Sequence, residues 1–332
     1  MTKKYQIVGI GNAMVDVLAH AEDSFLSDNG IEKGIMQLID MDRAVELYGK
    51  IGPATEISGG SAANTIAGAA HLGARTAYVG KVKDDQLGAI FAHDLRSQGV
   101  AYETTFAAKD AAQETGRCIV IVSPCGERSM NTYLGVTEFL EPSDIDETQM
   151  AQAEWIYLEG YRFDGPDSHE AFAKANKACK AAGGKVSLTL SDPFCVERHR
   201  DAFREMIKSD IDLLFCNRAE MLSMYQTEDF DAALQQAAAE VEIVACTDSD
   251  QGAHILSGGQ RWHAPAIPTD IVDATGAGDL FAGAFLWGLV NGHDLQACGN
   301  MGCIAASEVI SHIGARSEAD LTEVFKAKGL IS

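Results

Sequence analysis

Short apolar runs separated by helical stretches are the feature that most limits what this chain can fold into. The clearest runs cover residues 5–10, 155–158, 186–190, 211–215 and 241–245. Amphipathic stretches near 168–182, 197–208 and 230–240 lie between the later runs. Strands that alternate with helices pair in parallel, because each helix carries the chain back across the sheet. The pattern predicts a doubly wound sheet with helices on both faces, a three-layer α/β/α fold.

The first half of the chain does not show this alternation of strands and helices. Residues 13–20, 34–39, 116–123 and 129–133 have the character of short strands, and turn residues 124–127 join the last two in a β-hairpin. We therefore expect a small β lid inserted into the α/β domain of a single chain. The lid is expected to comprise approximately residues 13–45 and 99–135, and the large domain approximately residues 1–12, 46–98 and 136–332.

The charge balance excludes one class of partner. With 26 Lys and Arg against 48 Asp and Glu, the formal net charge is −22, whereas nucleic acids and anionic membranes attract basic surfaces. No apolar run approaches the ~20 residues that a membrane-spanning helix needs, and the first residues lead directly into a strand. The eight cysteines form no CxxC pair. We therefore predict a cytoplasmic protein with reduced thiols and without a nucleic-acid or membrane partner.

The segment DATGAGD, residues 273–279, predicts an anion site. It leads into an apolar helical stretch, so Gly276, Ala277 and Gly278 lie at a helix N-terminus. Unpaired amides of a first helical turn attract anions, and small residues leave those amides open. Asp279 then lies beside the bound anion. Asp is also a common N-cap residue, so a capping role is the alternative.

A second small-residue segment, GGSAAN at residues 59–64, also leads into a helix. Gly59 and Gly60 allow the backbone to approach a ligand closely. Asn64 carries both donors and an acceptor, which suits a pair of neighbouring hydroxyl groups. An Asn at the start of a helix is also an ordinary turn residue, which is the alternative for Asn64.

The N-terminal strand is followed by a segment that invites comparison with a dinucleotide-binding loop. Gly9-Ile10-Gly11-Asn12 lacks the third glycine of that motif, because Met occupies position 14. The chain also contains no GxxxxGK[ST] phosphate loop. Asp16 stands between two valines, where a carboxylate is costly unless something binds it, and a pair of sugar hydroxyls would satisfy it.

Asn217 and Glu220 follow an apolar strand directly, at the edge where ligands of open α/β sheets collect. A helix cap by Asn217 is the simple interpretation. The same element can place both side chains over a hydrated Mg²⁺ on a triphosphate, because magnesium prefers oxygen ligands and retains its waters.

Together these motifs resemble the ribokinase family of carbohydrate and nucleoside kinases, over nearly the whole chain and in the expected order. The resemblance implies the ribokinase-like fold with a β lid, and a reaction that uses ATP and Mg²⁺. It implies that Asp279 is the general base and that the amides of Gly276, Ala277 and Gly278 form the anion hole. Asn217 and Glu220 match the family's NxxE motif, which governs Mg²⁺ and phosphate binding.

The nucleoside-kinase branch of the family, adenosine kinase above all, is the most similar. By that likeness Asn12 and Asp16 match an opening GN…D in which Asp holds ribose hydroxyls, with help from Asn64. Further positions are assigned by the same likeness. They are Gly59, Gly60, Gln37, Ile39, Met130, Thr132 and Tyr161 for the substrate, Arg128 for the transferring phosphate, Thr247, Gly252 and Asn300 for the nucleotide, and Asp273 and Thr275 for a possible K⁺ ion.

Three positions depart from the pattern of that branch. Arg162 follows Tyr161 where two successive aromatic residues would face the base, so an arginine is expected as the second wall. Thr247-Asp248-Ser249 replaces the usual TxG on the nucleotide side, and Lys83 stands where glycine is more common.

Three functions fit these observations. The first is phosphorylation of a nucleoside, adenosine or a related ribonucleoside, on its primary hydroxyl by ATP. The second is the same reaction on a sugar such as ribose or fructose. The third is a non-catalytic nucleotide-binding regulator, which a carboxylate beside a phosphate site disfavours. The chain is expected to act as a monomer or as a homodimer formed through its lid.

Overall fold

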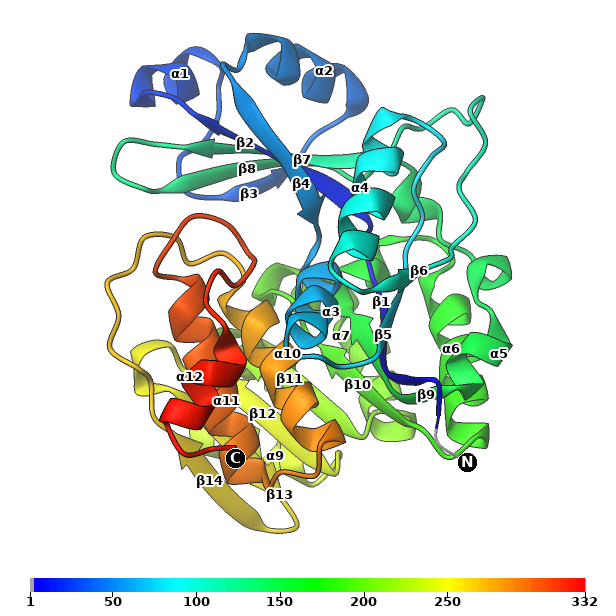
Figure 1. Cartoon of the computed structure of the whole chain (residues 1–332), viewed down its shortest axis with the longest axis vertical. Helices are drawn as coiled ribbons and strands as arrows, with labels where there is room; N and C mark the ends of the chain where they lie inside the picture. Colours follow the sequence, from blue (N-terminus) through cyan, green and yellow to red (C-terminus); the bar gives the residue numbers. More distant parts are fainter. Residues whose placement is uncertain (1–2, 332) are drawn as a thin grey trace.

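The computed structural model describes residues 3–331, which form a large sheet and a smaller sheet above it (Figure 1). The large sheet has the strand order β14-β13-β12-β11-β10-β9-β1-β5-β6. Its strands are β1 (Tyr5–Ile10), β5 (Thr76–Val79), β6 (Ala101–Tyr102), β9 (Ala153–Glu159), β10 (Lys185–Thr189), β11 (Leu213–Asn217), β12 (Ile243–Thr247), β13 (Ala253–Ser257) and β14 (Gln260–Ala264). Only β13 and β14 run antiparallel to their neighbours in this sheet. The parallel strands therefore end at one common edge.

Helices cover both faces of the large sheet and bury its alternate residues. Ile7 of β1 packs with one helical layer, whereas Val8 and Ile10 pack with the other. The first layer contains α3 (Ser61–His71), α4 (Gln86–Ser97), α10 (Ala277–Val290), α11 (Leu295–Val309) and α12 (Leu321–Ala327). The second contains α5 (Glu147–Ala151), α6 (Ser168–Ala181), α7 (Pro193–Ser209), α8 (Arg218–Tyr225) and α9 (Phe230–Ala238). The predicted three-layer α/β/α fold is confirmed.

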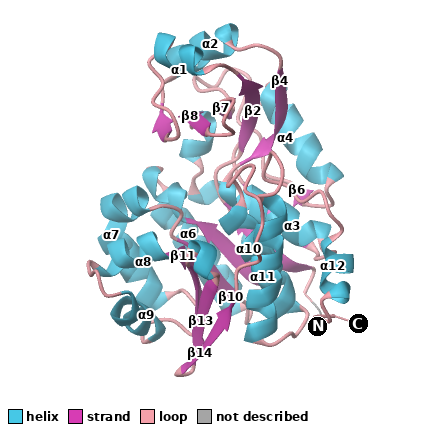
Figure 2. Cartoon of the chain, turned by 90° about the vertical axis from the view of Figure 1, so that its left-hand side faces the viewer, coloured by secondary structure: helices cyan, strands magenta, loops and turns pink. Residues whose placement is uncertain are grey.

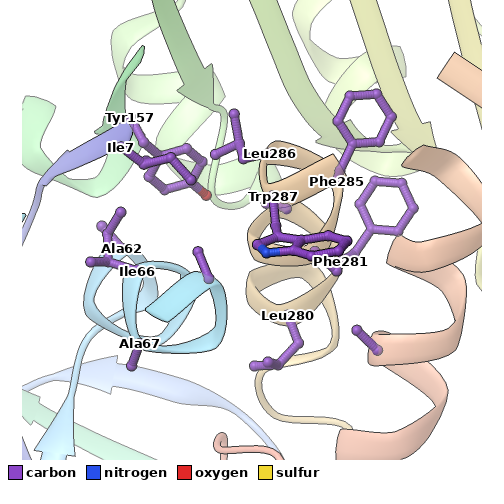
Figure 3. Close-up of a cluster of buried hydrophobic side chains, with 14 of the residues drawn as sticks. Ile7, Ala62, Ile66, Ala67, Tyr157, Leu280, Phe281, Phe285, Leu286 and Trp287 are labelled. Atoms are coloured by element: carbon purple, nitrogen blue, oxygen red, sulfur yellow. The ribbon is translucent and has the colours of Figure 1, made fainter. Parts of the chain in front are cut away.

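Helices α3 and α10 pack against each other in the first layer (Figure 3). Their small residues allow this close approach. A Cβ atom on Gly283 would lie 2.6 Å from the backbone oxygen of Thr65, and one on Gly68 would lie 2.7 Å from the Leu280 side chain. The contact places the N-terminal turns of the two helices side by side, and these turns carry the two glycine-rich motifs.

The small sheet has the strand order β3-β8-β7-β2-β4. Its strands are β2 (Met14–His20), β3 (Met36–Leu38), β4 (Ala54–Gly59), β7 (Gly116–Val122) and β8 (Arg128–Tyr133), and α1 (Asp23–Asp28) and α2 (Met41–Lys50) lie above it in both views (Figures 1 and 2). Strands β7 and β8 form the predicted hairpin. Ile119 and Ile121 of β7 belong to the apolar cluster that includes residues of α1 and α2, whereas Cys118 and Val120 belong to a second cluster.

The expected boundaries of the lid need correction. Strand β4 pairs antiparallel with β2 in the small sheet, although the sequence pattern places residues 46–98 in the large domain. Its sequence, ATEISG, has a single large apolar residue and therefore gives a weak strand signal. Strand β6 pairs with β5 in the large sheet, so residue 99 is too early for the second lid segment.

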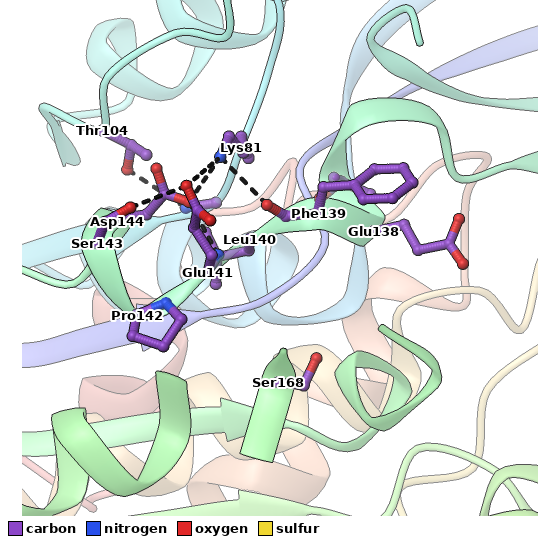
Figure 4. A network of polar contacts seen from close by, with 12 residues as sticks. Lys81, Thr104, Glu138, Phe139, Leu140, Glu141, Pro142, Ser143, Asp144 and Ser168 are labelled. Carbon is purple, nitrogen blue, oxygen red and sulfur yellow. Dashed lines mark hydrogen bonds and ion pairs between the residues drawn. The ribbon is translucent and has the colours of Figure 1, made fainter. Parts of the chain in front are cut away.

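A network centred on Lys81 holds the segment that returns from the small sheet to the large domain (Figure 4). This segment contains the 3₁₀ helices η1 (Gly135–Phe139) and η2 (Pro142–Asp144). Lys81 Nζ donates to Asp144 Oδ2 at 2.9 Å and to the backbone oxygen of Phe139 at 3.1 Å. Because Lys81 follows β5, these bonds attach the returning segment to the large sheet.

Two expectations about surface and thiols can be compared with residues 3–331. No helix in this range is long and apolar enough to cross a membrane. All eight cysteines are free, and Cys125 is the one that is exposed.

The buried aromatic cluster predicts a large loss of stability on truncation. Phe285 is fully buried, and its ring centroid lies 5.5 Å from that of Phe215. We expect Phe285→Ala to lower the free energy of unfolding by ~3–5 kcal/mol, because it leaves a cavity in the core. The matched control is Phe194→Ala at a position 69% exposed, where a change within ~0.5 kcal/mol is expected. Equal losses in urea denaturation would contradict the close packing of this cluster.

Candidate active site

A cleft of about 2010 Å³ lies between the small sheet and the carboxyl ends of the parallel strands. Most of the residues that the sequence singled out line this cleft. They are Asn12, Asp16, Gly60, Asn64, Arg128, Met130, Tyr161, Asn217, Glu220, Thr247, Asp273, Thr275, Gly276, Ala277, Gly278 and Asp279. The fold therefore brings residues from both halves of the chain into one site.

The first turn of α10 lines the cleft at the position where the sequence predicts an anion site. Gly276 has φ +82°, and a Cβ atom there would lie 2.9 Å from the Ala315 Cα atom, so this turn requires glycine. A Cβ atom on Gly278 would contact nothing within 4 Å, so the backbone around it is open. The amide of Ala277, which was expected in the anion hole, bonds instead to the Ala274 oxygen at 3.4 Å, so the expected set of amides needs correction. The amides of Gly278 and Asp279 follow in the first turn, where a helix provides no acceptor.

Asp279 is held by two donors from the start of α3. Ser61 Oγ donates to Oδ1 at 2.7 Å, and Asn64 Nδ2 donates to Oδ2 at 2.9 Å. Burial raises the pKa of the Asp279 carboxyl, while the Ser61 and Asn64 hydrogen bonds lower it. Asn64 thus donates one amide hydrogen to Asp279, so this hydrogen is not available to a ligand. Asp279 lies in the cleft as a half-buried carboxylate that two hydrogen bonds orient.

Asp16 lies on the opposite wall, on β2, and also in the cleft. Burial raises the pKa of Asp16 to about 6, partly offset by the charges of Arg316 and Arg128. A Cβ atom on Gly59 would lie 2.3–2.4 Å from the Asp16 carboxyl group, so Gly59 provides the space for this side chain. Gly59 therefore contributes to the site without lining the cleft. Within residues 3–331 no donor bonds to the Asp16 carboxylate, so it can accept bonds from a ligand.

Asn12 is fixed by three groups that sequence reasoning did not connect with it. Its backbone N–H donates to Glu159 Oε1 at 3.2 Å, and its backbone oxygen accepts from Tyr78 OH at 3.0 Å. Its side-chain oxygen accepts from Arg162 Nη1 at 3.1 Å, which leaves the Nδ2 group of the amide for the cleft. Glu159 also accepts from the Ala62 amide at 2.8 Å, and burial raises its pKa to about 7. A carboxylate at the end of a buried strand was the available signal for Glu159.

Arg162 is not the second wall of the ligand pocket. Its side chain is 1% exposed and lies outside the cleft lining. It donates to Thr137 O at 2.5 Å, to Ser168 Oγ at 2.9 Å and to two further backbone oxygens of the returning segment. A buried guanidinium needs several acceptors, and the carbonyls of η1 supply them. Tyr161, in contrast, does line the cleft.

Strand β3 presents different residues to the cleft than expected. Gln37 turns to the opposite face of the small sheet, where Nε2 donates to Asn131 Oδ1 at 2.6 Å. Ile39 packs with the α1 and α2 cluster. Met36 and Leu38 line the cleft instead, because successive side chains of a strand alternate between faces. Met130 and Thr132 line it as expected.

Arg128 and Asp273 form an ion pair across the cleft, between the lid hairpin and the segment before α10. The distance from Nη1 to Oδ2 is 3.1 Å, and both side chains are less than 10% exposed. Asp273 also accepts from the amides of Thr275 and Gly314. These donors contact both oxygens of the Asp273 carboxylate, and a K⁺ site at Asp273 and Thr275 stays a prediction. Arg128 Nε and Nη2 are buried without a partner within the described part of the chain.

Asn217 and Glu220 form a capping box at the start of α8. Asn217 Oδ1 accepts from the Glu220 amide at 2.9 Å, and both carboxylate oxygens of Glu220 accept from Asn217. Burial raises the pKa of Glu220 to about 7, and the nearby Asp192 carboxylate adds to this. Both carboxylates line the cleft and offer only oxygen ligands, so they fit a hydrated Mg²⁺ ion whose charge would relieve their repulsion. The capping interpretation of Asn217 is thus confirmed, and its role toward Mg²⁺ stays a prediction.

Gly252 and Asn300, which were expected to contact the nucleotide, and Lys83, which departs from the family pattern, lie outside the cleft lining and make structural contacts. Gly252 has φ +86°, and a Cβ atom there would lie 2.1 Å from the Ala264 oxygen, so it serves the turn between β12 and β13. Asn300 lies on α11 and accepts from Gln296 Nε2 at 3.1 Å. Lys83 donates to the Ala111 oxygen at 2.9 Å and thereby holds a loop. Neither Gly252 nor Asn300 lines the cleft, and the nucleotide contacts assigned to them stay predictions.

A carboxylate lies beside a helix N-terminus and faces the small sheet across a large cleft, an arrangement that suits phosphoryl transfer to a small molecule. The chain belongs to the pfkB family of carbohydrate kinases, whose family model matches residues 34–321. The family match confirms the expected membership in this kinase family. The structure also has the ribokinase-like architecture of its structural neighbours. The chain is therefore an ATP-dependent kinase that acts on a sugar or a nucleoside.

Individual relatives carry both kinds of name. A probable sugar kinase from Rhizobium etli CFN 42 is 46% identical, with a TM-score of 0.92 over 99% of this chain and 100% of that one. The adenosine kinase from Sinorhizobium meliloti is 45% identical, with a TM-score of 0.91 over 98% of this chain and 99% of that one. A 5-dehydro-2-deoxygluconokinase from Shouchella clausii is 28% identical over 280 residues, which are 81% of this chain and 86% of that protein.

The burial of Arg162 predicts that lysine cannot replace it. We expect Arg162→Lys to lower the free energy of unfolding by roughly 2–3 kcal/mol, because one ammonium group cannot reach the separate acceptors of the guanidinium. The control is Arg198→Lys, where a 46% exposed side chain pairs with Asp164 and a loss below ~1 kcal/mol is expected. Urea denaturation of both variants tests this. A neutral Arg162→Lys change would mean that its hydrogen bonds contribute little.

Proposed function

We propose that this kinase transfers the γ-phosphoryl group of ATP to the primary hydroxyl of a nucleoside, adenosine or a related ribonucleoside. The observation that carries the proposal is the Asp279 carboxylate, fixed by Ser61 and Asn64 beside the open amides of α10. Asp16 and the Nδ2 group of Asn12 face the same cleft and suit ribose hydroxyls.

The lid favours a nucleoside over a free sugar. Met36, Leu38, Cys118, Met130 and Leu134 give the cleft face of the small sheet an apolar surface. A nucleobase has a flat apolar face that such side chains can cover, whereas a free sugar presents hydroxyl groups in most directions. The 45% identity to an adenosine kinase supports the same choice.

The chemical step follows from the position of Asp279. Its carboxylate accepts the proton of the primary hydroxyl as the oxygen attacks the γ-phosphorus. The new O–P bond forms while the bond to the β-phosphate bridging oxygen breaks, and ADP leaves. The amides of Gly278 and Asp279 stabilise the negative charge on the transferring group, and the free nitrogens of Arg128 add positive charge from the lid.

Asn217 and Glu220 are proposed to hold the Mg²⁺ ion of the nucleotide through its waters. The ion neutralises phosphate charge and orients the triphosphate. Thr247, which lines the same end of the cleft, is proposed to contact the nucleotide. The lid is proposed to close over both substrates and exclude water, so that the phosphoryl group reaches the alcohol rather than solvent.

A sugar is the second candidate substrate. The 46% identity to a probable sugar kinase and the polar group of Asn12, Asp16 and Asn64 favour it, since these side chains can bind a polyol equally well. The non-catalytic regulator considered from the sequence is inconsistent with the kinase family to which the chain belongs. Cytoplasmic location and assembly through the lid stay predictions.

A substrate panel distinguishes the two candidates. ADP release is measured with MgATP and, in turn, adenosine, guanosine, ribose, fructose and 5-dehydro-2-deoxygluconate. The proposal predicts the highest kcat/KM for adenosine or another ribonucleoside. A higher kcat/KM for any free sugar or sugar acid would favour the second candidate.

Replacement of the proposed base tests the mechanism. We expect Asp279→Asn to lower kcat by ~10²–10⁴-fold, because the amide cannot accept the hydroxyl proton. The affinity for ATP, measured by equilibrium binding, should change only a few-fold. Near-normal turnover would mean that the Asp279 carboxylate only joins α10 to α3 through Ser61 and Asn64.

The space beside Asp16 provides a test of the substrate wall. Gly59→Ala places a Cβ atom where the Asp16 carboxyl group lies, so that side chain must move. We expect the KM for the alcohol substrate to rise ~10-fold or more, since hydrogen bonds to a carboxylate are lost, while the KM for ATP stays near its original value.

Gly52→Ala is the matched control, because a Cβ atom there contacts nothing within 4 Å. Its kinetic constants should equal those of the unmodified chain. If Gly59→Ala changed both KM values equally, Asp16 would not be specific to the alcohol side.

A further inference from the structure

Arg316 lies behind the proposed base, in the segment between α11 and α12. It is absent from the cleft lining and carries no role in the function proposed above. Its Nη1 donates to Asn64 Oδ1, and its Nη2 donates to both the backbone oxygen and the Oγ atom of Ser58 at 2.9 Å. One guanidinium therefore contacts both the start of α3 and the end of β4.

The contact with Asn64 determines which way its amide points. A guanidinium can only donate, so the amide oxygen of Asn64 must face Arg316. The Nδ2 group then faces the cleft side, where it donates to Asp279 Oδ2 at 2.9 Å. With the amide reversed, two donors would face each other and Asp279 would face an acceptor. Arg316 thus acts on the base through Asn64.

The charge of Arg316 is also placed among three carboxylates. Burial lowers the pKa of Arg316, whereas Asp94, Asp16 and Asp279 all raise it. Asp94 accepts from the amide and the Oγ atom of Ser58, at 3.0 and 2.5 Å. Burial raises the pKa of both Asp279 and Asp16, and the charge of Arg316 opposes this, so it favours their ionised forms.

We propose that Arg316 is a positioning residue for phosphoryl transfer, which holds the Asn64 amide in the orientation that fixes the Asp279 carboxylate toward the acceptor hydroxyl. The inference rests on the proposed function, because it assumes that Asp279 is the base. Through Ser58, the same guanidinium joins the lid strand β4 to this chain of contacts. The lid edge and the base are therefore held by one cation.

Other charged or titratable groups act on this region and must be considered in any pH dependence. They are Asp16 on β2, Tyr157 and Glu159 on β9, Arg128 on the lid hairpin, and Asp273 before α10. Burial raises the pKa of Asp279, and the positive charge of Arg316 counteracts this effect. Removal of Arg316 should therefore raise the pKa of Asp279 further.

The first test needs no substrate. The Asp279 carboxyl carbon is titrated by ¹³C NMR in aspartate-labelled protein and assigned by its loss in Asp279→Asn. We expect Arg316→Met to raise the pKa of Asp279 by about 1 unit, because an opposite charge is removed. Arg316→Lys should restore most of the difference. Ser58→Ala is the control, since it removes an Arg316 contact but leaves Asn64 and Asp279 joined, and it should leave the titration unchanged.

The second test measures turnover of adenosine, and of fructose, at saturating MgATP. We expect Arg316→Met to lower kcat by ~10–100-fold, because a displaced base costs rate, with KM for ATP within about 3-fold. The acid limb of its pH profile should move to higher pH. Arg316→Lys should keep the limb but recover only part of kcat, because an ammonium group lacks the fork of the guanidinium.

The outcomes separate the two proposals. An unchanged Asp279 titration in Arg316→Met, or a loss of kcat that lysine does not rescue and that leaves the acid limb in place, overturns the role of Arg316. If Arg316→Met does not fold, the titration and partial kcat of Arg316→Lys decide. Absence of turnover in the unmodified chain with every acceptor would refute the proposed function, and the NMR titration would still test Arg316.

Discussion

The close packing of α3 against α10 is the contact on which the site depends. Gly68 and Gly283 permit it, since a side chain at Gly283 would meet the backbone of Thr65. Because both helices begin at the carboxyl edge of the large sheet, the contact joins two motifs that are about 200 residues apart. Through this contact, Ser61 and Asn64 at the start of α3 donate hydrogen bonds to Asp279 in α10. The protein itself therefore orients the proposed base beside the proposed anion site.

The cleft concentrates carboxylates that the chain itself only partly compensates. Asp16, Glu159, Glu220 and Asp279 all have raised pKa values, and burial is the first cause in each case. The Glu159 carboxylate accepts hydrogen bonds from two backbone amides, whereas the Asp16 carboxylate accepts none within the described residues. Buried charges of this kind are costly in a structural core but are common where ligands and cations complete the environment.

The βα order predicts the fold from a local pattern, and the two glycine-rich motifs and the NxxE segment predict residues that the structure brings into one cleft. The wrong positions depended on information that is not local. The predicted substrate contact of Gln37 is wrong because a shift of one residue along a short strand moves a side chain to the other face of the sheet. The prediction that Arg162 forms a wall of the pocket is wrong. Its acceptors include backbone oxygens of the segment that contains Thr137, and a pattern of side chains in the sequence does not reveal them. The contacts of Arg316 were not predicted either, because its partners lie in β4 and α3, far away in the sequence.

The central claim is that the cleft transfers a phosphoryl group to a primary alcohol. The most direct measurement is ³¹P NMR of the product after the chain has consumed MgATP in the presence of adenosine. The account predicts equal amounts of ADP and of a phosphomonoester whose phosphorus signal is split by two protons of the adjacent CH₂ group. Inorganic phosphate as the only other product, or a phosphomonoester split by a single proton, would contradict it.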